Sequence, residues 1–328
     1  MRPHDTWPND VSLAVAEHRH EDLLELFAGP DARSRMLLGF VVPPDLDGGY
    51  CFAQLCLHHR NIDALRLIVE RAPAGISYQD TITYDCHHGT SSLFKTVTNL
   101  PMEALNCRSA AALQLAAEHE PKSPHFKTPI KAHGNKTLHL AGLDWLFQKR
   151  TTAADAADLA DACRVLMKMG APAHSKDDGS LSLVTILFSR AWHSYPAADQ
   201  LTQLVRDYVA AGAIQLAGRG PANQDQSPHA AYGNTPLEYA IKAGNGLAAA
   251  VAIELGADMK AATPAGHECL ISFAKDFAVL DDTQTLVPRI TEAVMRRQIR
   301  AVEAQEATLS SASLPPTSPP PRVGRLGL

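Results

Sequence analysis

The stretch from Gly233 to Asp258, GNTPLEYAIKAGNGLAAAVAIELGAD, constrains the fold of this chain more than any other. A second, weaker copy, GHECLISFA, begins at Gly266, 33 residues after Gly233. Self-similarity at a fixed period of roughly 20–50 residues is typical of repeat proteins, in which each unit contacts mainly its neighbours. The spacing therefore predicts a stack of similar units rather than one compact core.

Inside this stretch the residues predict two short helices joined by a tight turn. Thr235 and Pro236 favour a helix start, because threonine can cap the first backbone amides and proline loses no hydrogen bond there. Leu237 and Ala240 lie one turn apart, so they should share a buried face. Gly244 suits the left-handed residue that ends many helices. A second helix should then follow and end at Gly256.

T-P-L, an alanine at Ala240, a glycine at Gly244 and G-A-D at 256–258, at these spacings, resemble the ankyrin repeat family. The resemblance implies an all-α ankyrin repeat solenoid of stacked helix pairs with short hairpin fingers. The degraded copies of the repeat and the Ala/Arg/Pro-rich composition of the chain suggest a divergent bacterial member of this family. Family members of this kind act by presenting a concave surface to a partner.

Looser copies extend the pattern over most of the chain and predict about seven units. Gly179 and Gly212 are again 33 residues apart, and Gly134–Ala141 matches a helix start with His139 at the family's usual histidine position. The remaining expected units are a helix from Gly89 through Leu93 and Val97 paired with 109–119, helices at 50–57 and 61–69, a divergent pair at 10–28, and a capping helix at 282–305.

These copies predict three regions. Residues 1–130 would hold divergent N-terminal ankyrin-like repeats, residues 131–305 the clearer repeats with the capping helix, and residues 306–328 a disordered Pro/Ser-rich tail. The spacing between glycines also predicts two inserted loops, Gln148–Asp158 and Ile214–Tyr232. Long loops on a repeat scaffold often serve binding.

Composition limits the partners and the compartment. The net charge of −5 gives no basic field for nucleic acid, and no run of apolar residues is long enough to span a membrane. The six cysteines are scattered, as in reduced thiols of a cytoplasmic protein. The N-terminus lacks an apolar signal-peptide core, so the alternative to a cytoplasmic protein is a bacterial effector delivered into a host cell without a signal peptide.

No motif in the chain names a catalytic residue or a cofactor. Residues 244–249 match the dinucleotide fingerprint G-x-G-x-x-A, but a helix rather than a strand should precede them, so we expect no cofactor. The run Asp85-Cys86-His87-His88 collects ligand types for zinc, yet a second ligand pair would have to come from elsewhere. We expect no metal, and solvated histidines there remain the simpler interpretation.

Protein binding by a monomer is therefore the expected function. Applied to this chain, the family's contact positions fall on finger residues and on the variable positions of the first helices. We expect partner contacts at Tyr232, Tyr239, Lys242, Asp177, Asp178, Phe188 and Lys260. The alternative is an enzyme with a catalytic site in the divergent N-terminal helical region or in the insertions.

Overall fold

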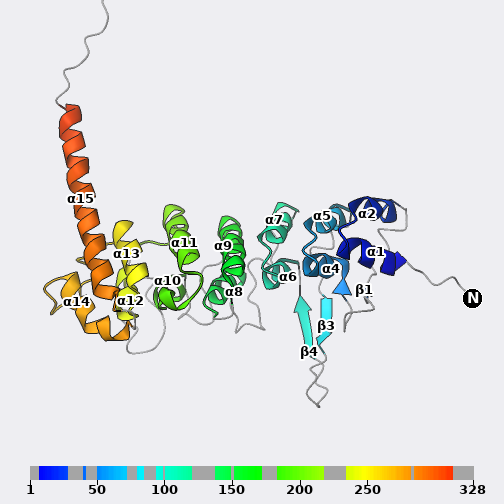
Figure 1. Ribbon diagram of the computed structural model, residues 1–328, viewed down its shortest axis with the longest axis horizontal. Helices are drawn as coiled ribbons and strands as arrows, with labels where there is room; N and C mark the ends of the chain where they lie inside the picture. The colour runs from blue at the N-terminus through cyan, green and yellow to red at the C-terminus, as the bar shows by residue number, and fades with distance from the viewer. Residues whose placement is uncertain are drawn as a thin grey trace, which may run out of the picture.

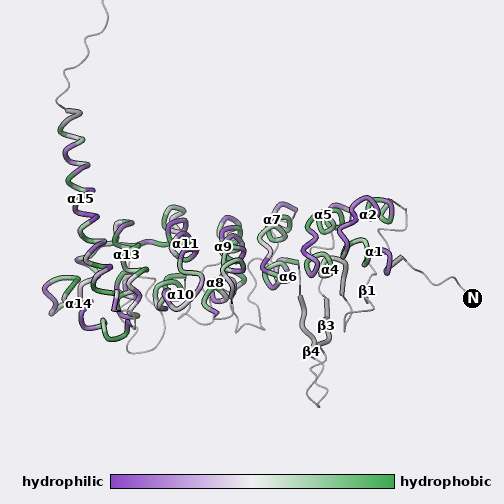
Figure 2. Tube along the Cα trace, viewed as in Figure 1, coloured by the Kyte–Doolittle hydropathy of each residue, from purple (hydrophilic) through white to green (hydrophobic). Residues whose placement is uncertain are grey.

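The computed structural model describes residues 7–28, 40–41, 50–71, 80–84, 94–98, 100–119, 137–148, 151–171, 183–217, 234–281 and 284–312. Within these residues the helices form seven pairs, which follow one another along an elongated row (Figure 1). Most helices carry both hydrophilic and hydrophobic segments (Figure 2), as helices with one buried face should. The predicted all-α class is confirmed.

Two layers of helices run the length of the molecule. The first helices of the pairs are α1 (Trp7–Ala16), α4 (Phe52–His58), α6 (Leu100–Asn106), α8 (Leu138–Leu146), α10 (Leu183–Phe188), α12 (Pro236–Lys242) and α14 (Leu270–Phe277). The second helices are α2 (His20–Leu26), α5 (Ile62–Arg71), α7 (Ala110–His119), α9 (Ala153–Lys168), α11 (Ala198–Ala210), α13 (Gly246–Glu254) and α15 (Leu286–Ala312). Each helix packs on the next one of its own layer.

The same backbone turn ends seven of the described helices. Its left-handed residues are His18, Arg60, Arg108, Gly170, Gly212, Gly244 and Gly256, with φ between 53° and 100°. The amide of each donates to the carbonyl three residues back, and the following amide donates to the carbonyl five residues back. This Schellman pattern satisfies the carbonyls that a helix end leaves open. The turn joins the two helices of a pair at four of these residues, and at Gly170, Gly212 and Gly256 it follows the second helix of a pair.

Arg60 provides a test of this turn, because a side chain in the left-handed region costs about 1 kcal/mol relative to glycine. Arg60 is exposed and has φ of 53°. We expect Arg60→Gly to raise the free energy of unfolding by about 1 kcal/mol, measured by urea denaturation.

Arg108→Gly is the matched comparison. Arg108 has φ of 56° but also forms an ion pair with Asp155 of the next helix pair. Replacement of Arg108 should therefore raise the free energy of unfolding less than replacement of Arg60 does. Equal gains would contradict a contribution from that ion pair, and a loss at Arg60 would contradict the strain argument.

Buried asparagines tie neighbouring pairs together. Asn61 begins α5, where its Oδ1 accepts from the Ala64 amide at 3.0 Å, while its Nδ2 donates to the Val15 carbonyl at 2.9 Å. Asn245 begins α13 in the same way, and its Nδ2 donates to the Arg190 carbonyl at 2.5 Å. In both places one side chain caps a helix and bonds the preceding pair.

Short strands occupy two of the connections. β1 (Phe40–Val41) pairs with β2 (Tyr50–Cys51), and β3 (Asp80–Tyr84) pairs antiparallel with β4 (Phe94–Thr98), Asp80 opposite Thr98. The prediction of a helix through Val97 is therefore wrong. Its four-residue spacing from Leu93 indicated a helix face, but the segment FKTVT is rich in β-branched and aromatic residues, which favour strands. The partner of α7 is α6.

Two further boundaries differ from the sequence-based expectation. Part of the expected insertion Gln148–Asp158 is helical, because Thr152 Oγ1 accepts from the Asp155 amide at 3.1 Å and starts α9 at Ala153. Residues 306–312 of the expected tail are helical instead, since α15 continues to Ala312. Residues 313–328 lie outside the described residues.

Candidate functional site

The first candidate surface lies on α12. Tyr239 is half-buried, and burial, followed by the nearby Glu238 carboxylate, raises the pKa of its hydroxyl. Lys242 Nζ lies 2.7 Å from Glu238 Oε1 and 2.9 Å from Asn234 Oδ1. Leu237 and Ala240 are fully buried, as the helical period predicted. Tyr239 and Lys242 therefore remain available at the surface, with the lysine held in place by its neighbours.

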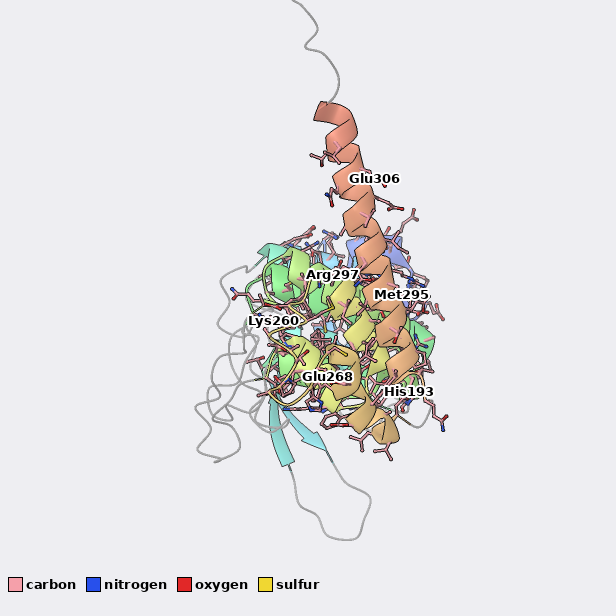
Figure 3. The ribbon with its side chains drawn as sticks, turned by 90° about the vertical axis from the view of Figure 1, so that its left-hand side faces the viewer. His193, Lys260, Glu268, Met295, Arg297 and Glu306 are labelled. Atoms are coloured by element: carbon pink, nitrogen blue, oxygen red, sulfur yellow. The ribbon has the colours of Figure 1, made fainter. Side chains whose placement is uncertain are left out.

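Lys260 belongs to a pocket at the end of the row, beside α14 and α15. In Figure 3 it appears with Glu268 on the end of the molecule that carries α15. The pocket has a volume of about 660 Å³ and combines apolar and polar groups: Met259, Lys260, Thr263, Pro264, Ala265, His267, Glu268, Cys269, Leu270, Ile271 and Val294. Asp258 Oδ1 accepts from the amides of Lys260 and Ala261, which shapes the loop. Such a hollow can receive an apolar side chain next to a cation.

Cys269 is an exposed thiol at the rim of this pocket, immediately before α14. Hydrogen bonds from the backbone amides of Ser272 and then Ile271 lower the pKa of its thiol, because they favour the thiolate. His267 contacts Phe273 edge-on, with ring centroids 5.1 Å apart. One pocket therefore contains both a cysteine thiol and a lysine.

The prediction of Phe188 as a partner contact is wrong. Its side chain is 0% exposed, as is that of Trp192, which follows α10 in the turn η4 (Trp192–Ser194). The indole nitrogen of Trp192 donates to the Leu187 carbonyl at 2.6 Å and folds the chain back over this helix. Phe188 is thus a core residue, and no partner can touch it in the folded protein.

Several predicted residues lie outside the described residues: Tyr232, Asp177, Asp178, the Asp85–His88 cluster and most of the Ile214–Tyr232 insertion. Among the described residues, no group of three His, Cys, Asp or Glu side chains is placed to hold a metal ion. None of the described helices, not even the long α15, combines the length and apolar character needed to cross a membrane.

A polar cluster that the sequence did not reveal joins α8 to α10. Arg190 Nη2 lies 2.7 Å from Asp144 Oδ1, and its guanidinium lies 4.9 Å from the centre of the Phe147 ring. Phe147 also meets Tyr195 edge-on, at 5.2 Å between ring centroids. The ion pair joins residues that are 46 positions apart, so no local motif could predict it. The cluster fixes how neighbouring pairs sit on each other.

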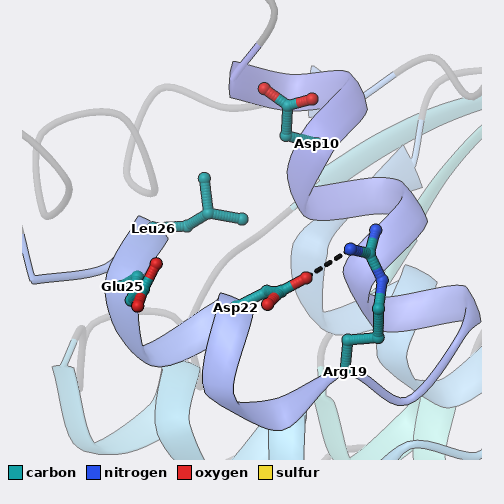
Figure 4. Close-up of a pocket in the computed structure, with 5 residues that line it drawn as sticks. All are labelled: Asp10, Arg19, Asp22, Glu25 and Leu26. Carbon is teal, nitrogen blue, oxygen red and sulfur yellow. Dashed lines mark hydrogen bonds and ion pairs between the residues drawn. The ribbon is translucent and has the colours of Figure 1, made fainter.

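A second hollow, also missed from the sequence, lies between α1 and α2 at the N-terminal end (Figure 4). It has a volume of about 460 Å³ and is lined by Asp10, Arg19, Asp22, Glu25 and Leu26. Arg19 forms an ion pair with Asp22, which leaves the carboxylates of Asp10 and Glu25 in excess. The hollow is acidic.

One polar cluster in the core joins three helices. His139 Nε2 lies 2.6 Å from the Tyr208 hydroxyl, and the Cys163 thiol also bonds that hydroxyl. Exposure of the three side chains is 0–1%, so no substrate can reach them. Their role is to support the packing of α8, α9 and α11.

Comparison with known proteins does not assign the chain to a family. No protein-family model matches it, and no curated protein matches it either.

Proposed function

We propose that the chain is a divergent ankyrin-type repeat protein that binds a partner protein through Tyr239, Lys242 and the pocket at Lys260. The observation that carries the proposal is the recurring Schellman turn, which ends seven of the described helices with the same hydrogen bonds. Repetition of one unit is expected of a binding scaffold, where neighbouring units build one continuous surface. The β3–β4 hairpin supports the same interpretation, since ankyrin units carry hairpin fingers.

The helix pairs in the N-terminal half favour a binding module over an enzyme. The described helices of this half stack in the same way: α4 packs on α5 and on α6, and α6 packs on α7, as in the C-terminal half. The inner sides of these helices are buried apolar residues such as Leu55, Leu65, Leu105 and Leu113.

The chemistry of the surface suggests the kind of partner segment. Lys260 stands beside the apolar side chains of Met259 and Ile271 in one pocket. A lysine is a strongly hydrated point charge that attracts carboxylates without fixing their orientation. We therefore propose a partner segment with an apolar anchor residue followed or preceded by an acidic one.

Binding can be tested by charge reversal at the pocket. After affinity capture and identification of a partner, we expect Lys260→Glu to weaken the measured affinity at least about fivefold, and Tyr239→Ala similarly, which corresponds to about 1 kcal/mol. Titration calorimetry measures the affinity, and a circular dichroism melt shows that each variant is folded.

Lys168→Glu is the matched control, because Lys168 is an exposed lysine at the end of α9 in the other helix layer. Glu254 is unsuitable as a control, since Arg206 at 3.4 Å and Arg296 at 3.3 Å bind it. Equal weakening by Lys168→Glu would indicate a general charge effect, and unchanged affinity for both pocket variants would place the binding surface elsewhere.

A further inference from the structure

The helix α15 packs on the body of the molecule with only its first half. Leu286, Ile290 and Ala293 are buried, with exposures of 0–2%. Gly246 allows this close packing, because a β-carbon there would lie 3.0 Å from the Leu286 Cα. Further along α15, Arg297 Nη1 donates a hydrogen bond to the Ala257 carbonyl at 2.6 Å. Beyond it, α15 extends past the other helices (Figure 1).

An apolar stripe runs along the free side of this helix. Met295, Ile299, Val302 and Leu309 are 55–64% exposed. Their spacings of four, three and seven residues are those of the a and d positions of a coiled-coil heptad, with Glu306 at the a position between Val302 and Leu309. At 100° per residue the stripe lies opposite the buried Leu286 and Ile290. Met295 and Arg297 accordingly lie on opposite sides of α15 in Figure 3.

The charges beside the stripe are unevenly distributed. One edge carries Arg289, Arg296 and then Glu303, so it changes from basic to acidic along the helix. The other edge carries the uncharged Thr291, Gln298 and Gln305. Two parallel copies would set each charged edge against an uncharged one. Two antiparallel copies would set the charged edges against each other, with arginine opposite glutamate at both ends.

We propose that the stripe is the contact between two copies of this chain, which pair antiparallel through α15. Ile299 then packs on Val302 of the second copy, Met295 lies beside that copy's Glu306, and Arg296 faces its Glu303. The stripe points away from the body, so the two bodies lie on opposite sides of the helix pair and do not collide. This dimer replaces the monomer expected from the sequence, and it goes beyond the proposed partner binding.

The contact should be weak. The stripe from Met295 to Leu309 spans about four helical turns, far less than a standard interface, so we expect a dissociation constant on the order of 10–100 µM. Sedimentation equilibrium of the full chain should give an average mass near 35.3 kDa at the lowest concentrations. The mass should rise toward twice that value at a few hundred micromolar.

Substitutions on the stripe test the contact directly. The double variant Ile299→Glu with Val302→Glu should remain at the monomer mass at all concentrations. The matched control is Ala301→Glu with Ala304→Glu, which adds the same charge to the opposite side of the same exposed part of α15. The dissociation constant of this control dimer should lie within about threefold of the parent value. A circular dichroism melt confirms that both variants keep the fold.

Charge exchange tests the antiparallel direction. Glu303→Arg sets arginine against arginine and should weaken the dimer at least about fivefold. Adding Arg296→Glu restores opposite charges and should recover most of the affinity, although Arg296 also bonds Glu254 and Glu292 within the chain.

Each result supports or overturns the proposal. A parent chain that stays monomeric up to several hundred micromolar overturns it. So does a dimer that survives the two stripe substitutions, or one that the charge exchange fails to restore. If the parent is monomeric but binds vesicles of anionic lipid through the stripe, the stripe serves a membrane surface and the self-pairing is wrong.

Discussion

Replacing Phe188 with alanine is expected to lower the free energy of unfolding by about 3–5 kcal/mol, the range for deleting a buried aromatic ring. The ring has 0% exposure and lies in the core with Ile186 and Leu187 of the same helix. Its removal loses apolar burial and leaves a cavity, because a close-packed core relaxes only partly around the gap. Urea denaturation followed by circular dichroism measures the change.

Val184→Ala provides the control for this prediction. Val184 lies in the same helix but is only half-buried, so its truncation should cost about 1 kcal/mol or less. A Phe188→Ala variant with unchanged stability would contradict the core assignment, especially if its partner affinity fell at the same time. That outcome would return Phe188 to the binding surface.

The contrast between Leu237 and Phe188 shows what the sequence can predict. In α12 the apolar residues alternate with Glu238, Tyr239 and Lys242, so the helical period identifies the buried face. The helix α10 reads LVTILF and is apolar almost all round. A helix without a polar side gives no period, and the sequence could not show whether Phe188 pointed inward or outward.

The pocket at Lys260 could not be predicted for a different reason. Its wall includes Val294 of α15, more than 30 residues after Lys260 in the chain. The Arg190–Asp144 pair likewise joins neighbouring helix pairs. Local patterns predict the helices and their turns, whereas such sites form only when separate pairs pack together. The misplaced helix near Val97 shows the limit even for local patterns, since a spacing of four also occurs within a strand.

The buried His139 should make the fold sensitive to acid. Burial lowers the pKa of its imidazole from 6.5 to about 4, and the hydrogen bond to the Ala171 carbonyl only partly opposes this. Because a carbonyl can only accept, Nδ1 holds the proton of the neutral ring and Nε2 accepts from the Tyr208 hydroxyl at 2.6 Å. Protonation of Nε2 would place a charge among Tyr208 and Cys163, away from water.

The direction in which stability changes with pH follows from the pKa of His139 in the unfolded and in the folded chain. Below pH 6.5 the unfolded chain binds a proton at His139, whereas the folded chain binds it only near pH 4. The contribution of His139 to the free energy of unfolding is therefore complete above pH 7. It falls as the pH drops, with a slope approaching about 1.4 kcal/mol per pH unit. Between pH 7.5 and pH 5 the loss should be about 2 kcal/mol. The Asp155 carboxyl, whose pKa Arg108 lowers, gives up its contribution to stability only at lower pH, below its usual pKa of 3.8.

Unfolding free energies from urea titrations at pH 7.5, 6 and 5 test this prediction. The parent chain should lose stability over this range, whereas His139→Gln should start lower at pH 7.5 and decline less, because its amide does not titrate. His119→Gln, at the exposed end of α7, is the control for loss of a histidine and should follow the parent. If the His139→Gln curve runs parallel to the parent from pH 7.5 to 5, the folded chain accepts the proton at His139 and its burial does not govern the response to acid.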